Sequence, residues 1–213
     1  MLYYNTVSPQ LEQILKDLMR AELFLPFRLV GGTALSLYYG HRMSVDIDLF
    51  TPAEYGSLDF WLLEQYLRNN YPYVDTMDFE VVSGKSFYIG ENENNCIKLD
   101  LYYNDGLIDD PVEVDGIRLA SKEAIIAMKM DVIQRTGRRK DFWDIHELIG
   151  EYSIEQMFAL HEKHFPWQHK RDLLIEKFTD FDDADDDLEP ECLKDKKWEL
   201  IKLDLAEFIN GLN

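Results

Sequence analysis

Cysteine and long apolar runs are scarce in this 213-residue sequence, and each scarcity excludes a class of protein. The two cysteines, Cys96 and Cys192, lie far apart without CxxC spacing, so neither a disulfide framework nor a zinc site is expected. No apolar run approaches the roughly 20 residues that a transmembrane helix needs. The first ten residues also lack the basic and apolar regions of a secretory signal peptide. The sequence therefore predicts a cytoplasmic protein with two free thiols and no membrane contact.

Basic residues are also few. The chain has 22 lysines and arginines against 41 aspartates and glutamates, which gives a formal net charge of −19. Broad, unspecific binding to nucleic acid depends on phosphate neutralisation by lysine and arginine, so this composition disfavours it but allows a local basic patch. Part of the acidic excess is concentrated in residues 180–191, which contain eight acidic residues and no basic one.

Apolar residues are plentiful, at 46% of the chain, and their periodicity predicts an α+β fold. Strands are expected at 27–30, 44–50, 74–82, 85–89, 96–103 and 116–119. Helices are expected at 9–23, 33–39, 54–70, from 121 to a basic turn at 135–140, from 141, and at 153–164, 167–178 and 195–210. We therefore expect a mixed sheet flanked by helices in a catalytic core over residues 1–120. A C-terminal helical bundle with the acidic segment follows over 121–213.

Two aspartates alternate with apolar residues on one predicted strand. Asp46 and Asp48 are two residues apart, so their carboxylates lie on one face about 7 Å apart at the backbone. Val45, Ile47 and Leu49 are expected on the other face, against the core. Two like charges this close repel each other unless a cation lies between them, and hard oxygen ligands suit Mg²⁺. On its own, the pair is more typical of a solvated strand face.

Two further features favour a metal and phosphate site. Gly31-Gly32 follows a strand and opens a helix, where free N–H groups attract anions; a tight strand-to-helix turn is the alternative. Asp100 lies in the middle of another strand and offers a third carboxylate. Three acids around two metal ions about 3.5–4 Å apart form the arrangement for nucleotidyl transfer. Asp46, Asp48 and Asp100 are therefore predicted to bind Mg²⁺ or Mn²⁺.

The stretch GGTALSLYYGHRMSVDIDLF, which begins at Gly31, resembles the signature of DNA-polymerase-β-like nucleotidyltransferases. More narrowly, it resembles the AbiEii/AbiGii toxin family of bacterial abortive-infection and toxin–antitoxin systems. That family also shows an arginine before S-x-D-I-D-L, then a helical lysine, a basic turn and R-D-x-x-D-L. These elements are Arg42, Ser44, Lys129 and the segment RKDFWDI at 139–145, where lysine stands in place of the usual arginine before the aspartate. The resemblance covers about residues 25–150.

The resemblance implies a nucleotidyltransferase-like fold that transfers a nucleoside monophosphate from an NTP to an acceptor hydroxyl. It implies that the following residues contact the nucleotide: Gly31, Gly32, Thr33, Arg42, Ser44 and Lys129. It also adds Asp141 to the three catalytic strand aspartates. The acceptor would be RNA, tRNA or a protein, and an antitoxin would be the partner. An RNA acceptor should contact basic residues, which are Arg135, Arg138, Arg139, Lys140, Lys163, Lys170 and Arg171.

The residues themselves leave simpler roles open. Lys129 is also consistent with a solvent-facing charge on its helix, and Asp141 with an acid favoured by the helix dipole. Arg42 is expected either to bind phosphate or to brace Asp46. Asp144 is expected to cap its helix or to pair with a basic residue of the preceding turn. At the level of function, the alternatives are a catalytically inactive binding or regulatory module of the same fold and a purely structural α+β domain.

Overall fold

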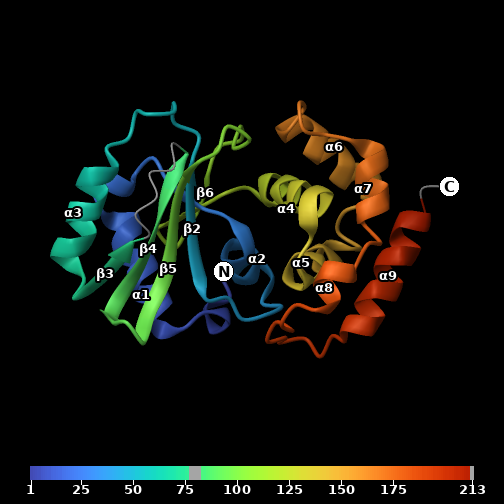
Figure 1. The fold of residues 1–213 in the computed structure, drawn as a ribbon, viewed down its shortest axis with the longest axis horizontal. Helices are drawn as coiled ribbons and strands as arrows, with labels where there is room; N and C mark the ends of the chain where they lie inside the picture. Colours follow the sequence, from blue (N-terminus) through green and yellow to red (C-terminus); the bar gives the residue numbers. More distant parts are fainter. Residues whose placement is uncertain (77–82, 212–213) are drawn as a thin grey trace.

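A mixed sheet forms the first half of the protein (Figure 1). The computed structural model describes residues 1–76 and 83–211. In these ranges the strands are β1 (Arg28–Leu29), β2 (Asp46–Thr51), β3 (Tyr73–Thr76), β4 (Gly84–Asn92), β5 (Asn95–Tyr103), β6 (Val112–Val114) and β7 (Ile117–Leu119). Their order is β3-β4-β5-β2-β1-β7-β6. Strand β2 is parallel to β5 and β1 is parallel to β7, while the other neighbours are antiparallel.

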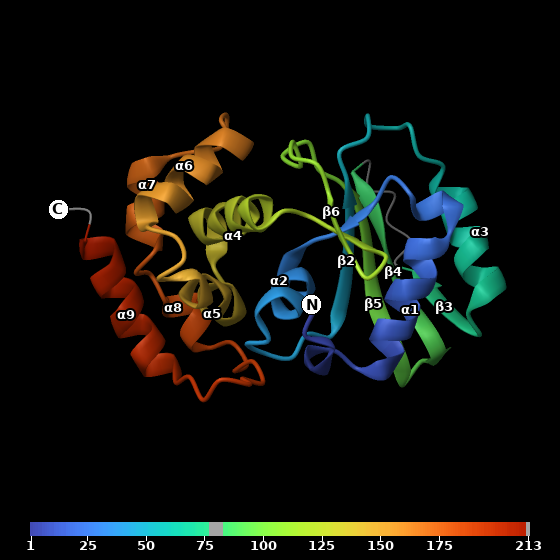
Figure 2. The ribbon, with the colours of Figure 1, turned by 180° about the vertical axis from the view of Figure 1, so that it is seen from behind.

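Helices pack against the sheet and form a second group beside it. They are α1 (Pro9–Arg20), α2 (Gly31–Tyr39), α3 (Phe60–Asn70), α4 (Lys122–Thr136), α5 (Arg139–Leu148), α6 (Ile154–His164), α7 (Arg171–Lys177), α8 (Asp182–Asp185) and α9 (Trp198–Asn210). Figures 1 and 2 show α1 and α3 on one face, with α2 between the sheet and the group α4–α9. The α+β class is confirmed. None of the described helices is both long and apolar enough to cross a membrane.

Serine caps begin two helices where the sequence predicts them. The Ser8 hydroxyl accepts the Leu11 N–H at 3.1 Å, and Pro9 occupies the first helical position, where it has no N–H to leave unpaired. The Ser121 hydroxyl accepts the Ala124 N–H at 3.0 Å and begins α4. The chain therefore leaves the sheet and starts its second helical group at the predicted residue.

The alternating strands place the core on the α1 and α3 side of the sheet. The apolar side chains of β2, β4 and β5 that face these helices are fully buried, and they are Ile47, Leu49, Phe87, Ile89, Leu99 and Leu101. The expectation for Val45 was wrong: its side chain is 67% exposed, because β2 begins one residue later, at Asp46. The acidic side chains of β2 consequently lie on the face opposite this core.

Other boundaries differ from the predictions for local reasons. The helix expected over 54–70 begins at Phe60, because Gly56 has a positive φ of 82° and the Asp59 carboxylate caps the helix. Strand β3 pairs with β4 as predicted, but residues 77–82 of the expected strand lie outside the described residues. Strand β6 and helix α8 were not predicted.

Near its C-terminal end, the chain returns from the helical group to the loop that precedes β2. The Met43 N–H donates to the Glu191 carbonyl and the Leu193 N–H to the His41 carbonyl, both at 2.9 Å. Residues 191–193 therefore fasten the helical group to the loop that precedes β2. The sheet precedes residue 120 and helices α4–α9 follow it, while the division of the chain into two domains there stays a prediction.

Candidate active site

The parallel pairing of β2 and β5 brings the strand carboxylates together. In this register Asp48 lies directly opposite Asp100, and Asp46 lies opposite Lys98. Because side chains alternate along a strand, all four lie on the same face of the sheet. The three acids that were predicted from separate strands are therefore neighbours.

The glycine pair at the start of α2 lies against this face. Gly31 has a φ of +69°, and a Cβ there would lie 2.5 Å from Asp48 Oδ2. A Cβ on Gly32 would lie 2.2 Å from Arg42 Nη2. Both contacts are shorter than real Cβ atoms tolerate, so the absence of side chains lets Asp48 and Arg42 approach the first turn of the helix. The first N–H groups of a helix lack intrahelical acceptors and attract anions.

Two hydroxyls fix the helix start to β2. Thr33 Oγ1 donates to the Asp46 carbonyl and is 2.8 Å from Ser44 Oγ. Thr33 and Ser44 are buried. These contacts hold the first turn of α2 in register with the carboxylates.

A cavity of about 190 Å³ opens between the sheet and the helical group. It contains nine of the ten predicted site residues, which are Gly31, Gly32, Thr33, Arg42, Ser44, Asp46, Asp48, Lys129 and Asp141. Arg138 and Lys140 also line it, together with the apolar side chains Phe50, Ile125, Met128 and Val132. Typical ligand pockets start at roughly 300 Å³, so a nucleotide must extend out of this cavity or push its two sides apart.

The acid cluster is electrostatically strained. Burial and then the neighbouring charges of Asp100 and Asp46 raise the pKa of Asp48 to about 6. Asp100 pairs with Lys98 through Oδ2, whereas its Oδ1 is buried without a hydrogen-bond partner among the described residues. Asp46 Oδ2 lies 3.9 Å from Lys140 Nζ, across the cavity. The three carboxylates are therefore only partly neutralised by nearby cations, and their mutual repulsion remains.

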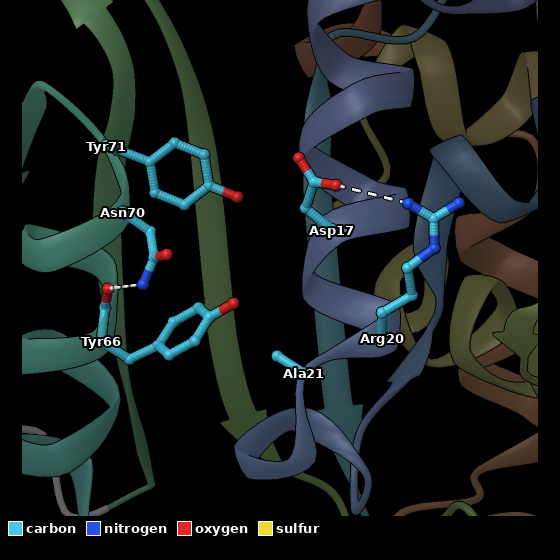
Figure 3. Close-up of a pocket in the computed structure, with 6 residues that line it drawn as sticks. All are labelled: Asp17, Arg20, Ala21, Tyr66, Asn70 and Tyr71. Atoms are coloured by element: carbon cyan, nitrogen blue, oxygen red, sulfur yellow. Dashed lines mark hydrogen bonds and ion pairs between the residues drawn. The ribbon is translucent and has the colours of Figure 1, made fainter.

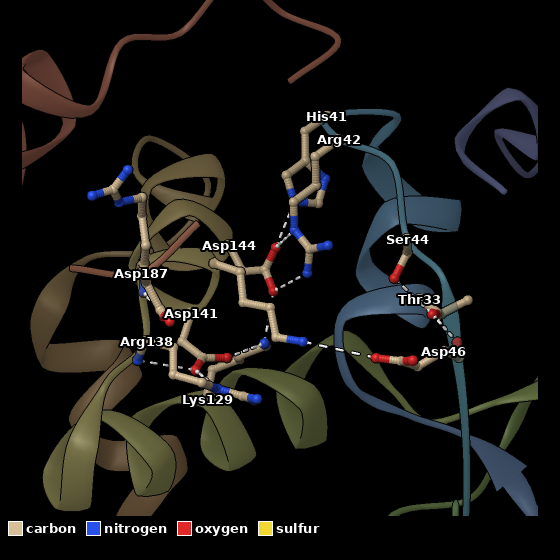
Figure 4. Close-up of polar contacts among 12 residues, drawn as sticks. Thr33, His41, Arg42, Ser44, Asp46, Lys129, Arg138, Asp141, Asp144 and Asp187 are labelled. Atoms are coloured by element: carbon tan, nitrogen blue, oxygen red, sulfur yellow. Dashed lines mark hydrogen bonds and ion pairs between the residues drawn. The ribbon is translucent and has the colours of Figure 1, made fainter. Parts of the chain in front are cut away.

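A buried ionic network joins the two sides of the cavity (Figure 4). Asp144 accepts from Arg42 Nε and Nη2 at 2.7 and 2.8 Å, lies 2.7 Å from His41 Nε2, and pairs with Lys129 at 2.7 Å. Lys129 also donates to Asp141 at 2.6 Å. Burial opposes ionisation of Asp144, yet the charges of Arg42 and Lys129 hold its pKa well below its ordinary value.

This network corrects three expectations. Arg42, only 4% exposed, pairs with Asp144 instead of bracing Asp46. Lys129 is 6% exposed and does not face solvent. Asp144 does not pair with the basic turn; its partners come from the loop before β2 and from α4. The sequence could not indicate the contacts with His41 and Arg42, because these residues are about 100 positions away from Asp144.

Several of the basic residues expected to contact RNA are engaged by other parts of the protein. Arg139 is engaged by the acidic segment, donating to the carbonyls of Ala184 and Asp185. Lys163 on α6 pairs with Asp109, which lies between β5 and β6, and Arg171 on α7 pairs with Glu155 on α6. Arg138 and Lys140 are the members of this set that line the cavity.

The three aspartates predicted to bind a metal ion do not form a closed cluster. Across residues 1–76 and 83–211, no three His, Cys, Asp or Glu side chains are close enough together to hold a metal ion. Asp100 also does not line the cavity. One of its oxygens is instead engaged by Lys98, a lysine on the same strand. Sequence reasoning missed Lys98, although its i, i+2 spacing from Asp100 was visible.

A second cavity lies on the other face of the sheet, between α1 and α3 (Figure 3). It measures about 340 Å³ and is lined by Asp17, Arg20, Ala21, Tyr66, Asn70 and Tyr71. It is larger than the first cavity but contains no predicted site residue. Size alone therefore does not identify the site; the smaller cavity combines the acids, the glycine turn and the cations.

Residues 13–210 match the family described as nucleotidyl transferase AbiEii toxin, type IV toxin–antitoxin (TA) system. The chain belongs to this family. The match extends well beyond residues 25–150, so the last helices are part of the family's fold. Among curated proteins, the chain is 32% identical over 133 residues to Uncharacterized protein aq_aa25 of Aquifex aeolicus (strain VF5). The aligned part spans 59% of the chain and 59% of that relative's length.

Solved structures share the AbiEii family member's fold. JHP933 from Helicobacter pylori superposes with a TM-score of 0.60 at 21% identity, covering 95% of this chain and 88% of that one. MenT4, a nucleotidyltransferase toxin from Mycobacterium tuberculosis H37Rv, gives 0.54 at 13% identity, covering 92% and 84%. The predicted nucleotidyltransferase-like mixed sheet is thereby confirmed.

Proposed function

We propose that this family member is the toxin of a toxin–antitoxin pair and transfers a nucleoside monophosphate from an NTP to an acceptor hydroxyl. One observation carries the proposal: Asp48, opposite Asp100 and two residues from Asp46, lies against the glycine start of α2. Carboxylates for a divalent cation and N–H groups for phosphate are therefore side by side.

The cavity lining suits a nucleoside triphosphate. The triphosphate would lie at the first turn of α2, with Arg138 and Lys140 facing it from the other side. The apolar wall would contact the nucleoside, and its members are Phe50, Ile125, Met128 and Val132. Binding would then draw the sheet and the helical group together on one ligand.

The carboxylates fit Mg²⁺ or Mn²⁺. Asp46 and Asp48 are hard oxygen ligands on one face. A bound cation would offset the repulsion from Asp100 and Asp46 that, after burial, raises the pKa of Asp48, and it would give the buried Asp100 Oδ1 a partner. A divalent ion bound there would activate the attacking hydroxyl and stabilise the pyrophosphate leaving group. Asp46 and Asp48 would hold it first, with Asp100 completing the set.

Asp141 is better placed to orient Lys129 than to act as a base. Its Oδ1 accepts from Lys129 and its Oδ2 accepts the Arg138 N–H, so both oxygens are engaged. Burial raises the pKa of Asp141, but the charge of Lys129 outweighs burial and lowers the pKa below its ordinary value. Asp141 is therefore a poor proton acceptor. Lys129, held by Asp141 and Asp144, would present a fixed charge to the triphosphate.

The charge of the protein bears on the chemical class of the acceptor. A protein or small-molecule acceptor fits the net charge of −19, whereas RNA or tRNA would have to rely on Arg138 and Lys140 near the cavity. An antitoxin partner and a cytoplasmic location complete the proposal.

The test is transfer of label from each α-labelled NTP to total RNA and to cell protein, with Mg²⁺ present. We expect labelling by the wild type and none by Asp46→Ala/Asp48→Ala. A matched control is Asp182→Ala/Asp183→Ala, which removes the same charge from exposed positions of α8 and should keep full activity. Equal labelling by both double variants would refute the proposal, and a folded protein that labels nothing would favour a binding module.

A further inference from the structure

A lysine lies beside the acid cluster, on the open face of the sheet that is opposite α1 and α3. Lys98 lies on β5, two residues before Asp100 and directly opposite Asp46 in the β2–β5 register. Its ammonium forms an ion pair with Asp100 Oδ2, and its side chain is about one-third exposed, at 36%. Lys98 therefore lies among the three carboxylates that the proposed function assigns to a divalent cation.

The charges around Lys98 favour its retention there. Asp100 contacts its ammonium directly, and Asp48 and Asp46 lie on the same face of the paired strands. Lys140 partly balances Asp46 from the far side of the cavity, at 3.9 Å. Among the described residues Asp100 forms an ion pair with Lys98 alone, so Lys98 is its counter-ion.

Asp100 itself is divided between two environments. One oxygen is engaged by Lys98, while the other is buried without a partner among the described residues. A metal that uses Asp100 as a ligand must approach within about 2.0–2.1 Å of a carboxylate oxygen if it is Mg²⁺. The positive ammonium on the same carboxylate would repel it.

We propose that Lys98 is the resident counter-cation of the acid cluster and a positioning residue that weakens metal binding until its ion pair with Asp100 is broken. The inference rests on the proposed function. In the free protein Lys98 occupies one oxygen of Asp100, so a metal that takes this oxygen must displace the ammonium. When a divalent ion binds, the ammonium turns to solvent on the open sheet face. Lys98 thus makes assembly of the third ligand conditional.

The test is Mn²⁺ binding by calorimetry without nucleotide. Lys98→Met keeps the length of the side chain and removes the charge, and we expect it to bind Mn²⁺ about tenfold more tightly, after discounting the Coulomb attraction for solvent exposure. Lys98→Arg should keep the wild-type affinity. The matched control is Lys85→Met: Lys85 lies on neighbouring β4 and pairs with Glu64 on α3, on the opposite face, so its loss should leave the affinity unchanged.

A merely structural role for Lys98 predicts the opposite sign, because a disordered site binds metal less well. Unchanged or weaker Mn²⁺ binding by folded Lys98→Met would overturn the proposal, and Lys98→Gln serves as the second variant if the first is unstable. Failure of the proposed function has a different signature. In that case the wild type and Asp46→Ala/Asp48→Ala would bind Mn²⁺ equally.

Discussion

Gly31 meets two separate demands, a left-handed backbone conformation and close contact with a proposed metal ligand. Its φ of +69° lies in the left-handed region, and a Cβ would lie 2.5 Å from an oxygen of Asp48. Gly56 meets only the first demand, since its φ is +82° and nothing lies within 4 Å of its Cβ position. Comparing substitutions at Gly31 and Gly56 therefore separates the cost of backbone strain from the cost of contact with Asp48, the proposed metal ligand.

We therefore expect Gly31→Ala to lower the free energy of unfolding by about 2–4 kcal/mol, and Gly56→Ala by about 1 kcal/mol, from strain alone. Urea denaturation of both variants measures the difference. Gly31→Ala should also weaken NTP binding, because Asp48 must move. Equal losses of stability in the two variants would mean that the contact with Asp48 is unimportant.

Asp48 gives the stability of the protein a distinctive pH dependence. Its folded-state pKa of about 6 exceeds the ordinary value of 3.8, so the folded state holds this proton more tightly than the unfolded chain. The contribution of Asp48 to stability is therefore fully present below about pH 4 and is lost as the pH rises through about 6.

Asp48→Asn keeps a neutral side chain at every pH and should remove this loss. In EDTA we expect the variant to be more stable than the wild type by about 1–2 kcal/mol at pH 7.5, with little difference at pH 4. Urea denaturation at the two pH values measures this. A stability difference that is the same at both would show that the ionised Asp48 is not strained.

At the scale of elements, the Asp144 network connects α5 with α4 and with the loop before β2. Its charges are buried, and removing one partner from such a network leaves the others unpaired. We expect Asp144→Asn to cost about 3–5 kcal/mol of unfolding free energy. Asp204→Asn, which breaks a half-exposed pair with His146, should change it by less than about 1 kcal/mol. Thermal and urea unfolding of both variants decide the matter, and a small loss for Asp144→Asn would contradict the network's role.

The sequence predicted elements best where periodicity and caps agree. Strands β2 and β5 alternate strictly, and the serine caps of α1 and α4 were visible. Helix α8 was missed because residues 180–191 carry almost no apolar pattern; it is ordered by contacts with Arg139 and Trp198 from other helices. Long-range hydrogen bonds of this kind have no local signature.

In the site, too, features with a local sequence pattern could be predicted and long-range contacts could not. The strand aspartates and the glycine turn could be found from spacing alone, because a strand and a helix start fix where side chains point. The partners of Arg42 and Lys129 could not, since α5 approaches them only through the tertiary fold. Lys98 was visible in sequence but lacked a reason for attention until the register placed it opposite Asp46.

At the scale of the whole molecule, the site lies between a sheet and a helical group that contribute different chemistry. The sheet side supplies carboxylates, and the helical side supplies Lys129, Arg138 and Lys140. The returning segment 191–193 and the Asp144 network keep the two sides in contact. A molecule of net charge −19 thus concentrates cations where a triphosphate would bind.

The most direct measurement is the anomalous scattering of Mn²⁺ in crystals grown with Mn²⁺ and a non-hydrolysable NTP. We expect a manganese peak bound by Asp46 and Asp48, with the nucleotide phosphates at the N–H groups of Gly31 and Gly32. Manganese remote from these carboxylates, or phosphates away from the start of α2, would contradict the account.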